Sequence, residues 1–388
     1  MKLANRVSDI AASVTLEITS RAKKMVKEGI DVVSFAAGEP DFDTPVHIKQ
    51  AAIKAINEGF TKYTPSSGTQ ELRDAISSKF KKDNSINYAP SQIVVSNGAK
   101  HSLYNIFQAI CQKSDEVMIP APYWLSYPAM VKMAEAKPVF VETRQENKFK
   151  VTEKELLSRI TKKTRCLVLN SPSNPTGSVY SADELERIAR LAVKHQFFVI
   201  SDEIYEKLIY DGVKHFSIAS LGKDIYDRTI TINGVSKSYA MTGWRIGYAA
   251  GPSDIMKAVA NAQSHATSNP SSISQKAALA ALAGDQECVE EMKREFENRR
   301  DMMVSRLAAM NKISCVKPDG AFYVMCNISK FGMGSIKIAN RLLEEAKIAV
   351  IPCEPFGADD FIRFSFATGI KSIEKGMDRL NDWIGANG

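Results

Sequence analysis

Short runs of β-branched and apolar residues alternate with helix-like stretches between about Ile93 and Gly251. Such alternation predicts a largely parallel β-sheet that helices cover on both faces. In the stretch SADELERIARLAVKHQ, Ser181 is placed to cap a helix and Glu184 to reciprocate. Ligands of these sheets bind beyond the carboxyl ends of the strands, so the residues after each run are the functional candidates. The expected strands are Ile93–Ser96, Glu116–Pro120, Pro138–Glu142, Cys166–Asn170, Phe197–Asp202, Thr229–Asn233 and Arg245–Gly251.

The pattern changes after about Ser271. A long amphipathic helix is expected from Asp285 to Met310, and a second helix closes the chain at residues 372–384. A chain of 388 residues is long enough for two domains. We predict a large α/β domain over residues 45–284 and a smaller α+β domain formed by residues 1–44 with 285–388. The strand candidates of the smaller domain are Gly320–Ile328, Lys347–Cys353 and Phe361–Ala367.

Composition argues against several classes of protein. The sequence contains no run of about 18 apolar residues that could span a membrane, and its N-terminal segment lacks the apolar core of a signal peptide. We therefore expect a cytoplasmic protein without a membrane partner. The net charge of +7 is mild, and Lys and Arg alternate with acids in EEMKREFENRR, which indicates a solvated helix face and no nucleic-acid partner. Because the cysteines and histidines show no ligand spacing, no metal site is expected.

The segment NGVSKSYAMTGWRIG places Lys237 just after a predicted strand and Arg245 eight residues later. A lysine at the carboxyl end of a strand can form a Schiff base with a carbonyl cofactor. The fork of an arginine suits a phosphate group, and Gly243 and Gly247 would permit close approach of the backbone. A lysine alone is more often a surface residue, but the whole string favours a cofactor site.

In VISDEIYEKLIY, Asp202 ends an apolar run, so its carboxylate should lie in a partly buried cleft. An ionised carboxylate there needs a cationic partner, and a protonated pyridine nitrogen would be one. Tyr205 follows three residues later and could reach the phenolic oxygen of such a cofactor. The alternative interpretation is a helix N-cap at Asp202 with an ordinary core tyrosine at position 205.

Further candidates follow other predicted strands. In NSPSNPTG, a loop that its prolines and glycine enforce, Asn174 offers an amide donor, although a plain turn explains the motif equally well. Gly98, Ala99 and Lys100 open a predicted helix, and a helix N-terminus binds anions. Trp124 could stack on a flat ligand, or could simply be a core residue.

Arg363 lies inside the apolar run IRFSFA. An arginine between Ile362 and Phe364 should not be left unpaired, and an acidic side chain or a substrate carboxylate could pair with it. A bidentate pair of arginine with carboxylate is what recognition of an amino acid requires.

In order along the chain, AGEPDF, KYTPSSGTQELR, NSPSNPTG, SDEIYE and SKSYAMTGWRIG form a highly specific set of motifs. With this set the chain resembles the fold-type I, class I aminotransferases that depend on pyridoxal 5′-phosphate, and among them the bacterial aspartate aminotransferase group. The resemblance runs essentially from end to end. It implies a homodimer with active sites at the subunit interface, and it makes residues 45–284 the cofactor-binding domain.

The resemblance also implies roles for individual residues. Lys237 would form the imine with the cofactor, Asp202 would contact the pyridine nitrogen, and Tyr205 would act with them in catalysis. The remaining cofactor contacts would come from Asn174 at the ring oxygen, Trp124 on the ring face, and Gly98, Ala99, Lys100, Arg245 and the neighbouring subunit's Tyr63 at the phosphate. The substrate would be bound by Arg363 at its α-carboxylate, with Gly38, Trp124 and Asn174.

Three positions depart from the pattern of the family. Gly234 stands where many relatives place a phosphate-binding serine, so one phosphate contact should be missing or supplied differently. No arginine is evident for the distal carboxylate of aspartate, and Lys100 is the candidate for that charge. Members that transaminate prephenate carry a lysine near the position of Ala11, and its absence lowers that expectation.

The resemblance thus implies transfer of the amino group of an L-amino acid, first of all aspartate, to 2-oxoglutarate by a ping-pong mechanism. Aminotransferases for aromatic amino acids, alanine or prephenate, and a cysteine-conjugate β-lyase on the same fold, remain alternatives. A non-catalytic regulator would need an added DNA-binding domain, for which we find no room. An NAD-dependent oxidoreductase fits the alternation, but the chain lacks the G-x-G-x-x-G fingerprint.

Overall fold

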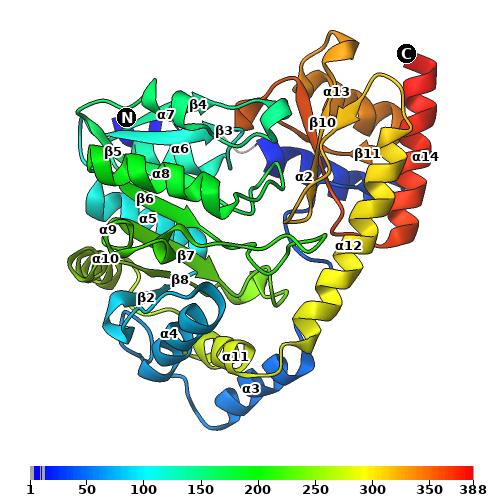
Figure 1. Ribbon diagram of the computed structural model, residues 1–388. Coiled ribbons are helices and arrows are strands. Elements are labelled where there is room, and N and C mark those ends of the chain that lie inside the picture. The colour runs from blue at the N-terminus through cyan, green and yellow to red at the C-terminus, as the bar shows by residue number, and fades with distance from the viewer. Residues whose placement is uncertain (1–3, 9, 11–13, 388) are drawn as a thin grey trace.

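Seven strands form one sheet in the computed structural model, which describes residues 4–8, 10 and 14–387. The order across the sheet is β2-β8-β7-β6-β5-β3-β4, and every neighbouring pair is parallel except the two that include β8. The prediction of a mostly parallel sheet is confirmed (Figure 1). The strands are β2 (Ile93–Ser96), β3 (Glu116–Ala121), β4 (Lys137–Glu142), β5 (Thr164–Asn170), β6 (Phe198–Asp202), β7 (Thr229–Gly234) and β8 (Gly247–Ala250).

The last predicted strand begins later than expected. We predicted extended structure from Arg245, but β8 starts at Gly247. Arg245 has a φ of +56°, in the left-handed region, so the chain turns there and cannot yet pair as a strand. The turn places Arg245 just outside the sheet, from where its side chain can reach a site at the sheet edge.

Helices cover both faces of this sheet, as predicted, because neighbouring strand residues point to opposite sides. Val94 packs with α5 (Ala99–Ile110), α6 (Ser126–Met133) and α10 (Ser253–Ala266) on one face. Val95 packs with α4 (Gln70–Asn84) and α11 (Ser272–Ala283) on the other. On that second face, α8 (Ala182–His195) covers Leu167 and Val199.

The N-terminus of α8 confirms the predicted capping box. Ser181 Oγ accepts a hydrogen bond from the Glu184 backbone N–H at 3.4 Å, and Glu184 Oε2 accepts one from the Ser181 backbone N–H at 2.8 Å. Two otherwise unpaired donors of the first turn are satisfied in this way.

A second, antiparallel sheet lies beside the first and has the order β12-β13-β10-β9 (Figure 1). The long predicted helix is present as α12 (Glu287–Ala308), and the closing helix is α14 (Ile370–Asn387). Residues from the N-terminal segment, such as Ile18 and Phe35, share the core of this region with Phe296 and Phe364. The strands are β9 (Ser314–Cys315), β10 (Tyr323–Asn327), β12 (Ile351–Pro352) and β13 (Phe361–Ser365).

The single strand predicted at Lys347–Cys353 is wrong. The segment forms β11 (Ile348–Ala349), which pairs in parallel with β1 (Val33–Ser34), and then β12, which pairs with β13. The physical reason is that the two halves of the run have different partners. The first half pairs with the N-terminal segment and the second half pairs with the four-stranded sheet. Pro352 has no N–H to donate, which fits the place of β12 at a sheet edge.

None of the helices in the described ranges is long and apolar enough to cross a lipid bilayer.

The α-helices not yet named are α1 (Asn5–Ser8), α2 (Val14–Lys27), α3 (Val46–Asn57), α7 (Glu153–Leu157), α9 (Lys223–Tyr226) and α13 (Ser335–Arg341).

The two glycines that the sequence marked for close backbone approach behave differently. A Cβ on Gly247 would lie 2.1 Å from the backbone nitrogen of Ala99 and 2.5 Å from the carbonyl carbon of Gly98, so this prediction is confirmed. A Cβ on Gly243 would meet no atom within 4 Å, so the expectation for that position is wrong. Gly247 therefore lets β8 contact the first turn of α5.

We predict that Gly247→Ala destabilises the protein by about 1–3 kcal/mol, because the added methyl group must displace the start of α5. Gly243→Ala is the matched control and should change the free energy of unfolding by less than about 0.5 kcal/mol. Urea unfolding followed by circular dichroism measures both. Equal stability of the two variants would contradict the close contact.

Candidate active site

A cavity of about 870 Å³ opens beyond the carboxyl ends of β5, β6 and β7. It is lined by residues of both sheets and of the N-terminal segment. All the site residues predicted from the sequence line it except Gly98 and Tyr63. The predicted residues found there are Gly38, Ala99, Lys100, Trp124, Asn174, Asp202, Tyr205, Lys237, Arg245 and Arg363.

Lys237 follows β7 and extends into this cavity. Its Nζ donates a hydrogen bond to the carbonyl oxygen of Gly38 at 2.6 Å. The pKa of Lys237 is lowered to about 8, chiefly by burial and also by the nearby cations Arg245 and Arg363, against the opposing charges of Glu39 and Asp202. A lysine with such a pKa is partly neutral near physiological pH, and the neutral amine is the form that attacks a carbonyl group.

Asp202 ends β6 and is buried. Its Oδ2 accepts a hydrogen bond from the Tyr127 hydroxyl at 2.7 Å, and its Oδ1 accepts one from the Ile204 N–H at 3.3 Å. Burial raises the pKa of Asp202 to about 6 against the opposing effect of these hydrogen bonds. The alternative interpretation as a helix N-cap is wrong, because residues 204–207 form a turn and no helix follows β6 directly.

Tyr205 lies on the same turn, and its hydroxyl is 3.0 Å from the Tyr323 hydroxyl. Burial raises the pKa of Tyr205 well above its usual value, so the phenol stays protonated at neutral pH and can donate a hydrogen bond. Tyr323 comes from β10 in the second sheet. The pair thus brings hydroxyl groups from the two sheets together at one wall of the cavity.

Arg363, in the middle of β13, is buried and lines the same cavity. Its Nη1 donates to Asn174 Oδ1 at 2.9 Å, and its guanidinium carbon lies 4.2 Å from the centroid of the Tyr323 ring. Within the described part of the chain, Arg363 forms no ion pair with a carboxylate, and its buried Nε has no hydrogen-bond partner. A buried guanidinium in this state is complementary to an anionic ligand.

The first turn of α5 forms another end of the cavity. Gly98 precedes the helix with a φ of +87°, and no side chain caps the helix there among the described residues. The free N–H groups and the helix dipole favour an anion. Arg245 lies against this turn: its Nη2 donates to the Asn97 carbonyl at 3.3 Å, and a Cβ on Gly98 would lie 2.4 Å from the same atom.

Lys100 and Trp124 lie together at the cavity wall. Lys100 Nζ is 4.8 Å from the centroid of the Trp124 ring. Burial and, next, the positive charge of Arg245 lower the pKa of Lys100. The face of the indole and the ammonium group are thus presented to the same ligand space.

Gly234, where the family resemblance leads us to expect a serine, has little room for a side chain. Its Cβ would lie 3.0 Å from the Gly247 Cα and 3.0 Å from the Ile246 carbonyl oxygen. Ser236 lines the cavity instead and offers a hydroxyl one residue before Lys237. Sequence reasoning missed Ser236, Tyr127 and Tyr323, because nothing in their local motifs shows that they converge on Lys237.

Tyr63 does not join the cavity of its own chain. Its side chain is 92% exposed, in the loop that follows α3. The sequence resemblance expected this tyrosine to serve a neighbouring subunit, and its position leaves it available for that role.

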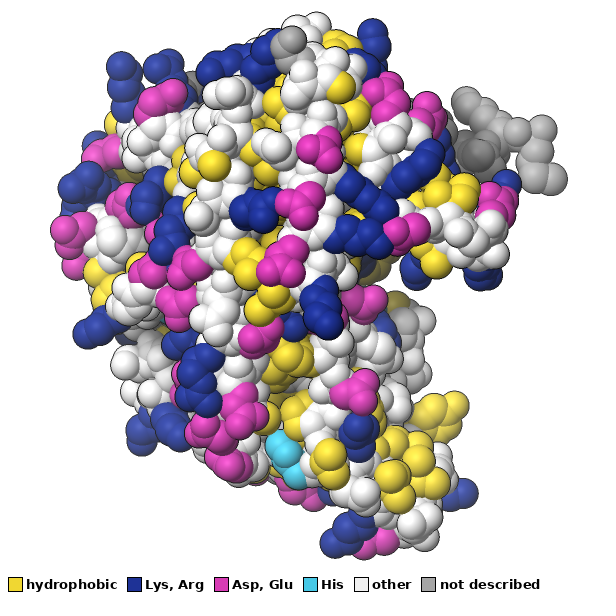
Figure 2. Space-filling model, turned by 90° about the vertical axis from the view of Figure 1, so that its right-hand side faces the viewer, with side chains coloured by type: hydrophobic (Ala, Val, Ile, Leu, Met, Phe, Trp, Pro, Cys, Tyr) yellow, Lys and Arg dark blue, Asp and Glu magenta, His cyan; other side chains and the backbone are white. Residues whose placement is uncertain are grey.

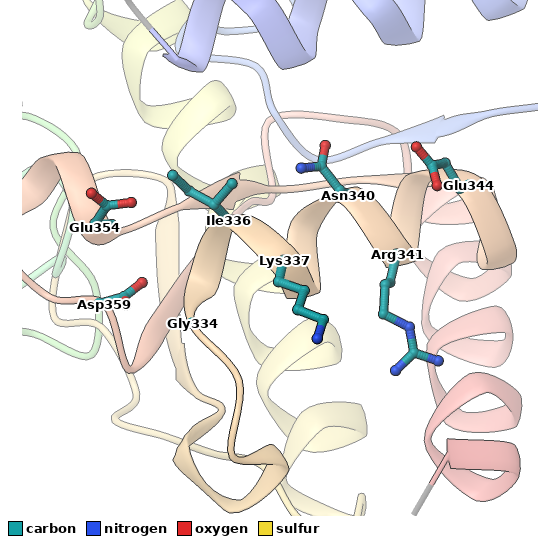
Figure 3. Close-up of a pocket in the computed structure, with 8 residues that line it drawn as sticks. All are labelled: Gly334, Ile336, Lys337, Asn340, Arg341, Glu344, Glu354 and Asp359. Carbon is teal, nitrogen blue, oxygen red and sulfur yellow. The ribbon is translucent and has the colours of Figure 1, made fainter.

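Two other features are weaker candidates for a site. A shallow hollow of about 470 Å³ runs along α13 (Figure 3), but its Arg341 and Glu344 already pair with Glu345 and Arg21. The ligand atoms of Glu203, Glu206 and His215 lie within 4.8 Å of one another. Lys79 pairs with Glu206 there and Asn84 donates to both carboxylates, so internal donors already serve this cluster.

The groups in the cavity fit pyridoxal 5′-phosphate. The open helix turn and Arg245 suit its phosphate, the buried carboxylate of Asp202 suits a protonated pyridine nitrogen, and the amine of Lys237 suits its aldehyde. The uncompensated Arg363 remains for the carboxylate of a substrate.

Comparison with known proteins agrees with this geometry. The family model for class I and II aminotransferases matches residues 30–380. The chain is 49% identical to an aspartate aminotransferase of Bacillus subtilis, over 99% of each chain, and 44% identical to an aspartate/prephenate aminotransferase of Nitrosomonas europaea, over 98% of this chain and 99% of the relative.

Solved structures show the same likeness. The crystal structure of an aspartate aminotransferase from Rhizobium meliloti superimposes with a TM-score of 0.96 at 41% identity, covering 99% of both chains. The Thermus thermophilus aspartate aminotransferase with maleate gives a TM-score of 0.95 at 42% identity, covering 98% of this chain and 99% of that one. The chain belongs to the class I and II aminotransferases and has the fold-type I architecture of these pyridoxal-phosphate-dependent enzymes.

Proposed function

We propose that the protein is an aspartate aminotransferase that passes the amino group of L-aspartate to 2-oxoglutarate by a ping-pong mechanism. The observation that carries the proposal is the buried guanidinium of Arg363, which has no carboxylate partner among the described residues and lines the same cavity as Lys237. The names of the relatives in Bacillus subtilis and Rhizobium meliloti support aspartate as the substrate.

Bound pyridoxal phosphate supplies an aldehyde that condenses with amines and a ring that withdraws electrons from the Cα of the amino acid. Lys237 would hold the aldehyde end, and the carboxylate of Asp202 would keep the pyridine nitrogen protonated. Tyr205 and Asn174 would donate to the ring oxygen, and Trp124 would cover the ring face. The phosphate would be held by Gly98, Ala99, Lys100 and Arg245, with the hydroxyl of Ser236 replacing the one absent at Gly234.

The substrate is oriented by the chain's own side chains. The fork of Arg363 would bind the α-carboxylate, with Asn174 and Gly38 beside it. The substrate amine would take the place of Lys237 at the aldehyde, and the freed Lys237 Nζ would be the base that removes the proton from Cα, since its lowered pKa leaves part of the amine neutral near neutral pH. Lys100 is our candidate for the distal carboxylate of aspartate.

Transamination of prephenate is the second candidate, because the Nitrosomonas europaea relative is named for both substrates. Ala11, where a lysine would favour prephenate, lies outside the described residues. Aromatic amino acids and alanine lack a distal carboxylate and would not use Lys100. A β-lyase would release ammonia without needing an acceptor, so the requirement for a 2-oxo acid separates it from an aminotransferase.

We also propose a cytoplasmic homodimer in which each subunit completes the partner's site. Val46, Ile53 and Ile56 are 66%, 48% and 52% exposed and recur at helical spacing on α3, which makes one apolar face. Figure 2 shows hydrophobic side chains gathered at the lower end of the molecule, where Figure 1 places α3. Tyr63 is exposed shortly after this face and would reach the partner's phosphate site.

The domain arrangement is part of the same proposal. Residues 45–284 would form the large cofactor-binding domain, and residues 1–44 with 285–388 the small domain. The shared core of Phe35, Phe296 and Phe364 supports the assignment of the N-terminal segment to the small domain.

The pH dependence of cofactor loading tests Lys237. Because only the neutral amine attacks the aldehyde, and the pKa of Lys237 is about 8, the rate of loading onto the apoprotein should rise with pH up to about 8 and level off above it. Stopped-flow absorbance after mixing with pyridoxal phosphate measures this rate. Lys237→Ala should show no such change, and a rate that keeps rising to pH 10 would refute the assigned pKa.

Paired substitutions test how the substrate is bound. Arg363→Lys loses the bidentate fork and should lower kcat/KM for aspartate and for alanine alike. The expected loss of transition-state stabilisation is about 2–5 kcal/mol. Lys100→Met keeps the backbone N–H at the helix start but should lower kcat/KM for aspartate alone. The expected loss of transition-state stabilisation is roughly 1.5–3 kcal/mol. Single-turnover kinetics with both amino acids gives the values. An equal loss for alanine in Lys100→Met would remove Lys100 from the recognition of the distal carboxylate.

A charge on the apolar face tests the dimer. Ile53→Lys should convert the protein from dimer to monomer in sedimentation velocity, since it places an ammonium group in an apolar interface. Leu157→Lys on α7 is the matched control, because Leu157 is 46% exposed and lies outside this face. A monomeric wild-type protein, or a dimer that Ile53→Lys leaves intact, would argue against α3 as the interface.

A further inference from the structure

Two glutamines that are fully buried hold the loop after Tyr63. Gln263 on α10 and Gln275 on α11 are both 0% exposed. Their side chains reach residues 62–69, which we call the Tyr63 loop. A buried amide group is stable only when its donors and acceptor are paired, and here three of the six partners, Thr64, Ser66 and Thr69, belong to this loop.

Gln275 binds both ends of the loop. Its Oε1 accepts a hydrogen bond from the Thr69 N–H at 2.8 Å, and its Nε2 donates to Thr64 Oγ1 at 3.0 Å. The same Nε2 also donates to the carbonyl oxygen of Pro270 at 3.0 Å. Gly68 lies between these contacts, and a Cβ on it would be 2.7 Å from Val95 Cγ2, so the loop is packed closely against β2.

Gln263 joins the loop to the strand that leads into the first turn of α5. Its Nε2 donates to the carbonyl oxygens of Ser66 at 2.6 Å and Val95 at 2.7 Å. Its Oε1 accepts a hydrogen bond from Asn105 Nδ2, on α5 itself, at 3.0 Å. One amide group therefore connects the Tyr63 loop, β2 and α5, and α5 begins at the turn that we assign to the phosphate.

The side chain that this loop presents is exposed. Tyr63 is 92% exposed, although the residues after it are fixed by buried hydrogen bonds. The segment before it is held as well, because Ser272 Oγ donates to the Phe60 carbonyl at 2.9 Å. A loop fixed on both sides gives an exposed tyrosine a defined position.

We propose that Gln263 and Gln275 are positioning residues that fix Tyr63 for the partner's phosphate site, and that Gln263 also couples this tyrosine to the phosphate turn of its own chain. The proposal rests on the proposed dimer with shared sites. In this arrangement the buried amide of Gln263 supports two features of its own subunit. One is the phosphate turn of that subunit, and the other is the loop whose tyrosine reaches the partner's site. The two sites of the dimer are thereby connected mechanically.

The test measures the dissociation constant of pyridoxal phosphate from the dimeric holoenzyme, by equilibrium dialysis, in single and double variants. Tyr63→Phe should weaken binding about tenfold, which corresponds to the loss of one hydrogen bond to a charged group. Gln275→Met should weaken binding by a similar factor alone and should add nothing in the Tyr63→Phe background. Gln263→Met should keep part of its effect in that background, because it also supports the chain's own turn.

Gln286→Met is the matched control. Gln286 likewise donates to backbone carbonyls, those of Ala281 and Gly284, but it does not touch the Tyr63 loop, and its variant should bind the cofactor as the wild type does. Thr64→Val removes only the hydroxyl that Gln275 reaches and gives a milder test should Gln275→Met not fold. It too should have no effect once Tyr63 is replaced.

Three results would overturn the proposal. The first is a full, additive loss from Gln275→Met in the Tyr63→Phe background, which would make Gln275 a general stabilising residue. The second is unchanged binding in Gln275→Met and Thr64→Val while Tyr63→Phe binds weakly, which would leave the shared site intact without the positioning role. The third is unchanged binding in Tyr63→Phe itself, which would reject the shared phosphate site together with the role of the glutamines.

Discussion

A buried guanidinium that pairs with no carboxylate in the described part of the chain is the constraint on which the site depends. Arg363 is held in the middle of β13 by pairing with Met325 and Ile351, so it cannot withdraw to solvent. Asn174, beyond β5 of the large sheet, accepts one of its hydrogen bonds. The other N–H donors of its guanidinium are available to a ligand in the cavity, and an anionic substrate would supply the negative charge that pairs with the guanidinium. The two sheets must keep their relative position for this pairing, which explains why the site lies where they meet.

Burial acts on the two reactive groups in opposite directions. It lowers the pKa of Lys237 to about 8, so part of the amine is neutral at neutral pH. It raises the pKa of Asp202 to about 6, so the carboxylate is still mostly ionised at neutral pH but would be stabilised by a cation such as a protonated pyridine nitrogen. Tyr127 holds the carboxylate of Asp202 in place through a hydrogen bond, and the Gly38 carbonyl does the same for the amine of Lys237. The chain therefore prepares both ends of the site for a charged aromatic cofactor before that cofactor binds.

Much of the fold could be predicted from local pattern, because each strand of the large sheet is a short apolar run and α8 carries its own capping box. Candidate residues just beyond strand ends, such as Asp202 and Lys237, were found for the same reason. The split of residues 347–353 was missed, since strand partners far away in sequence decide it. Gln263 and Gln275 were missed as well, because a glutamine in an amphipathic helix looks the same whether it faces solvent or holds a loop.

The most direct test of the central claim is the absorbance of the purified holoprotein when L-aspartate is added without a 2-oxo acid. If Lys237 holds the cofactor and Arg363 receives the α-carboxylate, the absorbance of the cofactor bound to Lys237 should disappear. One oxaloacetate should form for each active site, without release of ammonia. An absorbance that aspartate leaves unchanged, or that never develops when pyridoxal phosphate is added to the apoprotein, would contradict the account.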